Sequence, residues 1–367
     1  MAAQGRCVVS VAHDAMWFES LVPGCSARAS ILSRLKDWFA VKPFSSSLHG
    51  FLNLAKPPGW TSREVVDFVV RLFPRRSAPK VGHAGTLDPL ATGVLVVAVG
   101  EATKLIDRVQ AQTKVYTATI RLGAESDTLD AAGVVVERDP AGLVPPSVEQ
   151  IENALQEQVG IIQQVPPAHS ALKVGGRRAY ELARAGETVE LAARPVRIDA
   201  IRLTGYQWPR VEIEIECGAG TYIRSIARDL GQTLGTGGII EVLTRTRIGQ
   251  FRLEEAHAPG DLSLNRLEEV LIAPLEAMIG RPRVRLTEEQ MDAILQGKRL
   301  DASVVAWASP PAINDQGEVA LVAPESRGGH LVALAEPLGH SGIVWLQPRR
   351  VLATNANPTD FRGVQGM

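Results

Sequence analysis

Strict alternation of apolar and charged residues in one short segment constrains the fold more than any other feature of the chain. Residues 211–217 read VEIEIEC, so four apolar side chains fall on one face and three glutamates on the other. A period of two is typical of a strand with one face buried and the other in water. Residues 116–122 alternate in the same way, and residues 94–99 form the continuous apolar run of a buried strand.

Helices are predicted between these strands at irregular intervals. Thr61 and Ser62 can cap a helix whose apolar side chains continue at helical spacing to Leu72. Residues 150–159 and 221–234 are predicted to be helical as well, the latter with its apolar side chains on one face. Because strands and helices do not alternate as regular βαβ units, the sequence predicts an α+β fold with a central mixed, mostly antiparallel sheet.

The pattern changes past residue 280, where one predicted helix and several short strands follow. We therefore expect a main domain over residues 50–280, a small β-rich domain over residues 281–352 and a flexible tail over residues 353–367. Residues 1–49 hold eight serines and no sustained period. They favour a disordered extension, or a sequence begun upstream of the true start, over a targeting segment.

Composition excludes several classes of protein. Lys and Arg number 39 against 40 Asp and Glu, so no global basic field indicates a polyanionic partner. Three widely spaced cysteines argue against a disulfide framework and against a zinc site, and they indicate a reducing compartment, which we expect to be the cytoplasm. No window reaches the roughly 18 apolar residues of a membrane-spanning helix, so a membrane protein is not expected.

Three local stretches are basic although the whole chain is not. They are residues 63–80, 173–197 and 224–252. Each alone is typical of a solvated face. If the fold brings all three beside one glycine-rich loop, they would form an electrostatic groove for phosphates.

That loop, residues 82–93, reads GHAGTLDPLATG and is the most unusual stretch of the chain. Its single carboxylate, Asp88, precedes a proline, which is most often the place of a turn or capping residue. An aspartate held rigidly between apolar neighbours is also a setting that prepares a nucleophile or base. His83 has no second metal ligand at helical or hairpin spacing, and the chain contains no HExxH, GxxxxGK[ST] or GxSxG motif.

Asp127 and Asp130 are a second place where carboxylates could work together. Paired carboxylates are typical of glycosidases. The surrounding segment 126–133, SDTLDAAG, is better interpreted as a turn with capping side chains, and the glycosidase reading stays an alternative.

Four motifs follow one another along the chain: KPPG at 56–59, GHAGTLDPLATG at 82–93, QVPP at 164–167 with SALK at 170–173, and GTYIRS at 220–225. In order and spacing they resemble the bacterial tRNA pseudouridine synthase B (TruB) family. The resemblance covers about residues 50–352 and leaves residues 1–49 outside.

The resemblance implies isomerisation of the T-loop uridine at tRNA position 55 to pseudouridine, without a cofactor or metal. The N1–C1′ glycosidic bond breaks and the base is rejoined through C5. By match to the motif, Asp88 is the nucleophile; whether it attacks C1′ or C6 of the base, or acts by a glycal route, stays open. Tyr116 is expected to stack on the flipped base and to take part in proton transfer, and Arg224 to pair with Asp88.

Further positions follow from the same resemblance. Leu243 matches an apolar pocket position, and His83 the residue that helps displace the base from the T-loop stack. Lys56, Tyr222 and Lys173 are expected to bind substrate. The C-terminal part resembles an RNA-binding PUA module, a small β-barrel, through GKRL at 297–300 and QPRRVL at 347–352. The implied partner is the T-arm of tRNA, with no protein partner and a monomeric enzyme.

The chain departs from the family pattern at a few positions. The family usually has Thr at Ala84, Tyr or Phe at His169, Asp at Ala55 and Ser-Lys at residues 218–219. These changes bear on RNA affinity and its pH dependence more than on the chemistry, because Asp88 and its two expected partners are present.

Two alternatives remain open at this point. The first is an RNA-folding protein that grips the T-arm without turnover. The second is a glycosidase-like hydrolase that uses Asp88 with Asp127 or Asp130 and releases free base or sugar.

Overall fold

The computed structural model describes residues 48–170, 172–174, 176–179, 182, 185, 191–309, 317–340 and 343–352. The tail expected over residues 353–367, and all but the last two residues of the extension expected over residues 1–49, lie outside this part of the chain.

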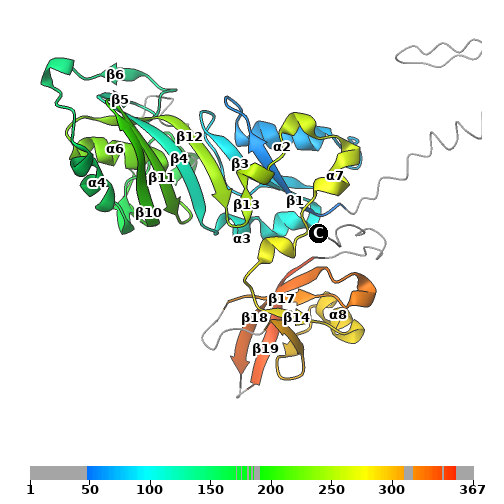
Figure 1. Cartoon of the computed structure of the whole chain (residues 1–367). Coiled ribbons are helices and arrows are strands. Elements are labelled where there is room, and N and C mark those ends of the chain that lie inside the picture. Colours follow the sequence, from blue (N-terminus) through cyan, green and yellow to red (C-terminus); the bar gives the residue numbers. More distant parts are fainter. Residues whose placement is uncertain are drawn as a thin grey trace, which may run out of the picture. The chain divides into compact units, whose positions relative to one another are not determined.

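A nine-stranded sheet forms the main part of the molecule (Figure 1). Its strands run in the order β1-β3-β12-β4-β11-β10-β7, with β2 paired to β3 and β13 to β12. Every pair is antiparallel except β3 with β12, so the central mixed, mostly antiparallel sheet of an α+β fold is confirmed. The strands are β1 (Gly50–Lys56), β2 (Val81–His83), β3 (Thr92–Val99), β4 (Lys114–Leu122), β7 (Gly160–Gln164), β10 (Arg194–Gln207), β11 (Arg210–Cys217), β12 (Gly238–Ile248) and β13 (Phe251–Arg252).

Alternation explains how these strands pack. In β11 the apolar side chains are buried, and glutamates from its other face pair with arginines of other strands. Arg202 of the adjacent strand β10 pairs with Glu214, and Arg247 of β12, two strands away, pairs with Glu216. In β3 seven of eight residues are buried, and its apolar side chains share a cluster with Phe51 of β1 and with Leu105 and Val109 of the segment that follows β3. Two short hairpins stand apart from the sheet: β5 (Ala124–Ser126) with β6 (Val135–Glu137), and β8 (Lys173–Val174) with β9 (Arg177–Arg178).

The predicted helices start within two residues of the positions that the sequence suggests. The first, α2 (Ser62–Arg71), begins after Thr61, one of its two candidate capping residues, and Thr61 forms a capping box with Glu64. The second begins two residues earlier than predicted, as α4 (Val148–Gln156), because Ser147 caps it. Within the described ranges the other α-helices are α3 (Ile106–Gln110), α6 (Ile223–Thr233), α7 (Leu264–Val270) and α8 (Glu288–Leu295).

Helix α6 matters most for the site. Its apolar face, with Ile223, Ile226 and Leu230, is buried, and the helix packs against β12 and α4. Short 3-10 helices complete the connections: Gly100–Leu105, Pro140–Gly142, Leu253–Glu255, Pro259–Asp261, Glu276–Met278 and Glu325–Arg327.

The C-terminal residues form a six-stranded sheet in the order β15-β19-β18-β17-β14-β16. It carries α8 and has its own core around Val284, Ile294 and Leu321, which agrees with the small β-rich unit predicted after the main sheet. A boundary at residue 281 stays a prediction; Ala320 and Leu334 also belong to the apolar cluster that contains Phe51. The strands are β14 (Arg283–Arg285), β15 (Leu300–Asp301), β16 (Ala306–Ser309), β17 (Val319–Val322), β18 (Leu331–His340) and β19 (Ile343–Val351).

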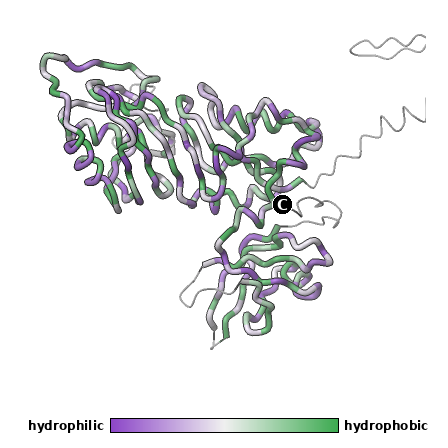
Figure 2. Tube along the Cα trace, viewed as in Figure 1, coloured by the Kyte–Doolittle hydropathy of each residue, from purple (hydrophilic) through white to green (hydrophobic). Residues whose placement is uncertain are grey.

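Hydrophobic and hydrophilic residues are interleaved along the strands of both sheets (Figure 2). No helix in the described ranges combines the length and the apolar character that crossing a membrane requires.

Candidate active site

Asp88 lies in the loop that joins β2 to β3, and neighbouring elements hold the loop on both sides of it. Ser62 of α2 donates its hydroxyl to the Leu87 carbonyl (3.1 Å) and accepts a hydrogen bond from the Leu87 amide (2.8 Å). Lys56, at the end of β1, donates to the Pro89 carbonyl (3.2 Å). The backbone on either side of the Asp88 carboxylate is therefore fixed by groups from two other elements.

The structure brings Asp88 together with Arg224, the second residue of α6. Arg224 Nε lies 2.9 Å from Asp88 Oδ2; the arginine side chain is 5% exposed and the aspartate side chain 36%. The other guanidinium nitrogens donate to backbone carbonyls, Nη1 to Thr128 (2.7 Å) and Nη2 to His169 (3.0 Å). These contacts fix the direction of the guanidinium and leave the Asp88 carboxylate accessible beside it.

A second carboxylate faces the same arginine. Asp130 Oδ2 lies 3.6 Å from Arg224 Nη1, and its side chain is 7% exposed. Its other oxygen accepts hydrogen bonds from the Thr128 hydroxyl (2.7 Å) and the Ala132 amide (3.0 Å). The turn-capping interpretation of Asp130 is thus correct but incomplete, since the residue also faces the arginine that binds Asp88.

The turn that carries Asp130 is strained and tied to the sheet. Leu129 has φ 62°, the only positive φ of a non-glycine residue in the described ranges, and its carbonyl accepts from the Ile240 amide of β12 (3.1 Å). Asp127, in the same turn, accepts from the Val134 amide (2.8 Å) and is half exposed.

The charge of Asp88 is set by opposing effects. Burial raises the pKa of the Asp88 carboxyl above its usual range, Arg224 lowers this pKa and Asp130 raises it. Burial also lowers the pKa of Lys56 to about 8 and lowers the pKa of His83, with the nearby Arg245 guanidinium adding to the shift of His83.

Tyr116 of β4 is buried and lies beside Arg245 of β12. The guanidinium carbon of Arg245 is 6.0 Å from the centre of the tyrosine ring. Burial raises the pKa of the Tyr116 hydroxyl, and the charge of Arg245 opposes that rise. The sequence motifs do not indicate a role for Arg245. The feature that could have indicated one is its position two residues after Leu243 in the same strand, because side chains two residues apart in a strand lie on the same face, here the buried one.

The other predicted substrate-binding residues lie on different elements of the fold. Leu243 is buried opposite Ala118 of β4, and His83 lies on β2. Tyr222 precedes α6; its backbone exchanges hydrogen bonds with the Gln164 side chain (2.9 and 3.2 Å), and the guanidinium of Arg194 lies 5.1 Å from its ring. The side chain of Lys173 is outside the described part of the chain.

Lys56 is buried, and its ammonium group is occupied by backbone. It donates to the carbonyls of Pro57 (3.0 Å), Trp60 (2.5 Å) and Pro89 (3.2 Å). These contacts hold the KPPG turn against the Asp88 loop. Binding of substrate by Lys56 remains a prediction.

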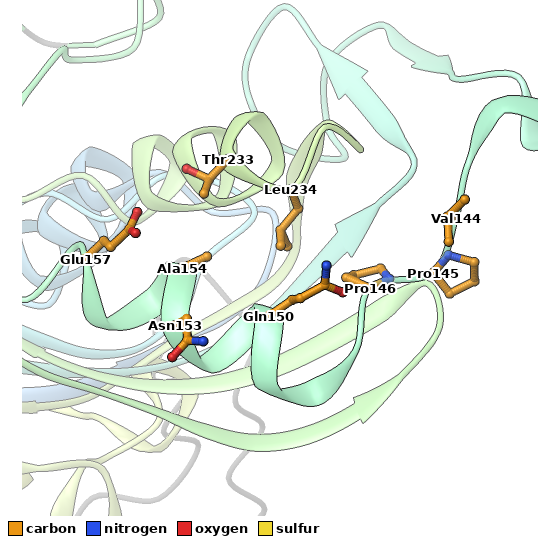
Figure 3. A pocket seen from close by; sticks show the side chains of 9 residues that line it. All are labelled: Val144, Pro145, Pro146, Gln150, Asn153, Ala154, Glu157, Thr233 and Leu234. Carbon is orange, nitrogen blue, oxygen red and sulfur yellow. The ribbon is translucent and has the colours of Figure 1, made fainter.

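A hollow of about 380 Å³ lies away from this group of residues (Figure 3). It borders α4 and the C-terminal end of α6, whereas Arg224 belongs to the first turn of α6. Its lining residues are Val144, Pro145, Pro146, Gln150, Asn153, Ala154, Glu157, Thr233 and Leu234. Among the described residues, no three His, Cys, Asp or Glu side chains are grouped as a metal ion would require.

Comparisons with known proteins agree with the motifs. Residues 72–223 match the family model described as TruB family pseudouridylate synthase (N terminal domain). The chain is 41% identical over 292 residues to "tRNA pseudouridine synthase B" of Mycobacterium bovis (strain BCG / Pasteur 1173P2), covering 78% of this chain and 96% of that protein. It is 44% identical over 306 residues to the protein of the same name from Mycobacterium sp. (strain KMS), covering 82% and 96%.

A solved structure, "Crystal Structure of a Cbf5-Nop10-Gar1 Complex", contains a chain that is similar in fold. The TM-score is 0.63 at 26% identity, over 83% of this chain and 85% of that one. Identity above 40% to two relatives over almost their whole length, together with the order of the four motifs, shows that this chain belongs to the TruB family of pseudouridylate synthases.

Proposed function

We propose that this protein isomerises the T-loop uridine at position 55 of tRNA to pseudouridine, with Asp88 as the nucleophile. The observation that carries the proposal is the ion pair between Asp88 and the buried Arg224. Asp88 lies in a loop that Ser62 and Lys56 fix by hydrogen bonds. The two relatives named tRNA pseudouridine synthase B support tRNA as the substrate class.

The reaction rearranges bonds within one nucleotide. The N1–C1′ bond breaks and a C5–C1′ bond forms, while C5 loses a proton and N1 gains one, so no atom is gained or lost overall. A nucleophilic carboxylate must be ionised, and Asp88 lies where burial opposes ionisation. Arg224 favours the ionised form and keeps one carboxylate oxygen in a fixed direction. Attack at C1′ and attack at C6 both need this charged oxygen as the nucleophile. The glycal route needs it as a base.

The uridine must leave the T-loop stack before its glycosidic bond can be reached. Extrusion costs a few kcal/mol unless new stacking partners replace the lost ones. Tyr116 supplies an aromatic ring on the strand beside Leu243, and its hydroxyl is the group proposed for proton transfer. The Tyr116 hydroxyl is protonated at neutral pH, as in an ordinary tyrosine, and burial raises its pKa further.

The rest of the substrate is proposed to bind through shape and backbone contact. Arg75, Arg76 and Lys80 are exposed in the segment that leads into β2 and the Asp88 loop. Exposed cations beside a reactive loop suit RNA phosphates. The T-arm is the bound element in this proposal, with the six-stranded sheet as a second RNA-binding surface.

We also propose that the enzyme is a monomer acting in the cytoplasm. The only cysteine within the described ranges, Cys217, is a buried free thiol, as a reducing compartment allows. Light scattering after gel filtration, with and without tRNA, tests the monomer directly; a dimer mass in both samples would contradict it.

The activity test uses an unmodified tRNA transcript, chelator and no added cofactor, followed by mapping of pseudouridine along the RNA. The proposal predicts pseudouridine at position 55 and none in a transcript with cytidine there. Tight binding without product would indicate an RNA-folding protein instead. Release of free uracil would indicate the hydrolase.

A further inference from the structure

Arg245 is a buried cation whose nitrogens all face backbone carbonyls. The residue is 1% exposed. Its Nε donates to the carbonyl of Val94 (2.8 Å), Nη1 to that of Thr86 (3.3 Å) and Nη2 to that of Gly85 (3.1 Å). No ion pair within the described ranges includes Arg245. Burial of a charge without a counter-ion is costly, so these carbonyl groups stabilise the guanidinium in place of a carboxylate.

The three carbonyls belong to the two ends of the Asp88 loop. Gly85 and Thr86 precede Asp88 by three and two residues, and Val94 lies on β3, where the loop has rejoined the sheet. One guanidinium therefore ties the start of the loop to the strand that follows it. An arginine fork suits this task because its donors have a fixed mutual geometry.

Gly93 allows this close approach. It pairs with Arg245 in the parallel β3–β12 contact and has φ +98°. A Cβ atom at Gly93 would lie 2.2 Å from the Arg245 carbonyl oxygen, a distance that backbone cannot accommodate. Because Gly93 has no side chain, β12 comes close enough to β3 for the Arg245 side chain to contact the carbonyl groups at both ends of the loop.

The same side chain meets Tyr116 from the neighbouring strand. Arg245 and Tyr116 are partners in the β12–β4 register, with the guanidinium carbon 6.0 Å from the ring centre. The register shifts between Arg245 and Arg247, so Thr246 is an extra residue at this point. Bulges of this kind change the direction of a side chain and are common beside active sites.

We infer that Arg245 is a positioning residue that fixes the Asp88 loop and the Tyr116 ring relative to each other without touching the uridine. The inference rests on the proposed function, because its effect is measured on the isomerisation. It assigns to Arg245 a task distinct from that of Arg224, whose nitrogens face the carboxylates of Asp88 and Asp130.

Arg245→Lys is the informative variant, because lysine keeps the positive charge but lacks the planar guanidinium with its donors in fixed positions. We expect the single-turnover rate of pseudouridine formation to fall by about 10- to 100-fold. A loss of this size is typical when reacting groups are displaced by up to about one ångström. The dissociation constant for tRNA should stay within about twofold. Arg247→Lys is the matched control. Arg247 lies on the same strand, two residues further on, in a partly buried ion pair with Glu216 (2.8 Å), and this variant should keep the wild-type rate.

A double-mutant cycle with Tyr116→Phe separates positioning from general stability. If Arg245 acts partly through Tyr116, the combined variant loses less than the product of the two single losses, whereas Arg247→Lys with Tyr116→Phe loses the product. Thermal unfolding and an Arg245→Gln variant, which loses the charge and keeps one NH2 group, accompany the cycle.

Three results would overturn the inference: a wild-type rate in Arg245→Lys, a loss of tRNA affinity as large as the loss of rate, or loss of the folded state in both the Lys and Gln variants. An inactive wild-type enzyme would instead count against the proposed function.

Discussion

Arg224 is the residue on which the charge of Asp88 depends most directly. Burial and Asp130 both favour the protonated form of Asp88, and Arg224 is the nearest group that favours the ionised form. The pKa of Asp88 is therefore raised but held below the value that burial alone would give it. An enzyme that needs the Asp88 carboxylate should lose activity as the pH falls through this raised pKa.

Arg224→Gln should move the acidic limb of the single-turnover rate to higher pH, by about 1–3 pH units, because the carboxylate loses its neighbouring cation. The rate should consequently fall more at pH 6 than at pH 8. Arg228→Gln is the control; Arg228 lies one turn further along α6 and contacts Asp229 and the Val165 carbonyl. Identical limbs in the two variants would contradict the assigned role of Arg224.

Lys56 gives a second pH-dependent prediction, on stability. The pKa of Lys56 is about 8 in the folded protein against 10.5 ordinarily, so between these values the unfolded chain holds a proton that the folded protein has released. The free energy of unfolding therefore gains a contribution that rises with pH over this range.

Lys56→Met removes the contribution. The wild-type advantage over Lys56→Met in unfolding free energy should be larger near pH 10 than near pH 8, by about 1–3 kcal/mol. Denaturant titrations at both pH values measure it. Lys80→Met, at an exposed position, serves as the control. A constant difference across this range would show that Lys56 is not the group that titrates.

At the scale of elements, the first turn of α2 supports the reactive loop. Thr61 caps the helix, which frees Ser62 to bind both backbone groups of Leu87, the residue before Asp88. A helix that is already fixed to the sheet thereby fixes the loop.

Ser62→Ala should lower the unfolding free energy by about 1–3 kcal/mol, because the buried amide and carbonyl of Leu87 lose their partner. The single-turnover rate should fall with it. Ser77→Ala removes an exposed hydroxyl, whose contact to the Pro74 carbonyl is 3.4 Å, and should leave both quantities unchanged. Equal behaviour of the two variants would show that Ser62 does not support the loop.

The sequence predicts elements with a strong local pattern and misses contacts between distant ones. The period of two predicts β11 and most of β4, and Thr61 marks the start of α2. The contact of Asp130 with Arg224 joins residues 94 positions apart, and the capping pattern around Asp130 already accounts for that carboxylate locally. Nothing in KPPG shows that the lysine turns inward to carbonyls, since a lysine beside a turn more often points to water.

At the scale of the molecule, Glu318, the residue before β17, links the C-terminal sheet to helix α3. It accepts from Arg108 of α3 (2.8 and 2.5 Å), and Arg281 Nη1 lies 3.3 Å from it. Glu318 is 17% exposed, and hydrogen bonding to Arg108 lowers its pKa. The six-stranded sheet is thus connected to the main part of the molecule by an ion pair to α3 as well as by apolar contact.

Glu318→Gln should lower the unfolding free energy by about 1–3 kcal/mol, because two partly buried guanidinium groups lose their carboxylate. It should also weaken tRNA binding while leaving the single-turnover rate at saturating tRNA unchanged. Glu336→Gln removes an exposed pair with Arg349 inside the C-terminal sheet and should cost about 0–1 kcal/mol. An unchanged stability and tRNA affinity in Glu318→Gln would contradict this account of the connection.

The central claim is that the Asp88 carboxylate performs the isomerisation. The most direct test compares wild type, Asp88→Asn and Asp127→Asn on one unmodified tRNA transcript, with pseudouridine mapped along the whole RNA and tRNA affinity measured in parallel. We predict pseudouridine at position 55 from wild type and Asp127→Asn, and none from Asp88→Asn at unchanged affinity. Pseudouridine formed by Asp88→Asn at the wild-type rate would contradict the claim.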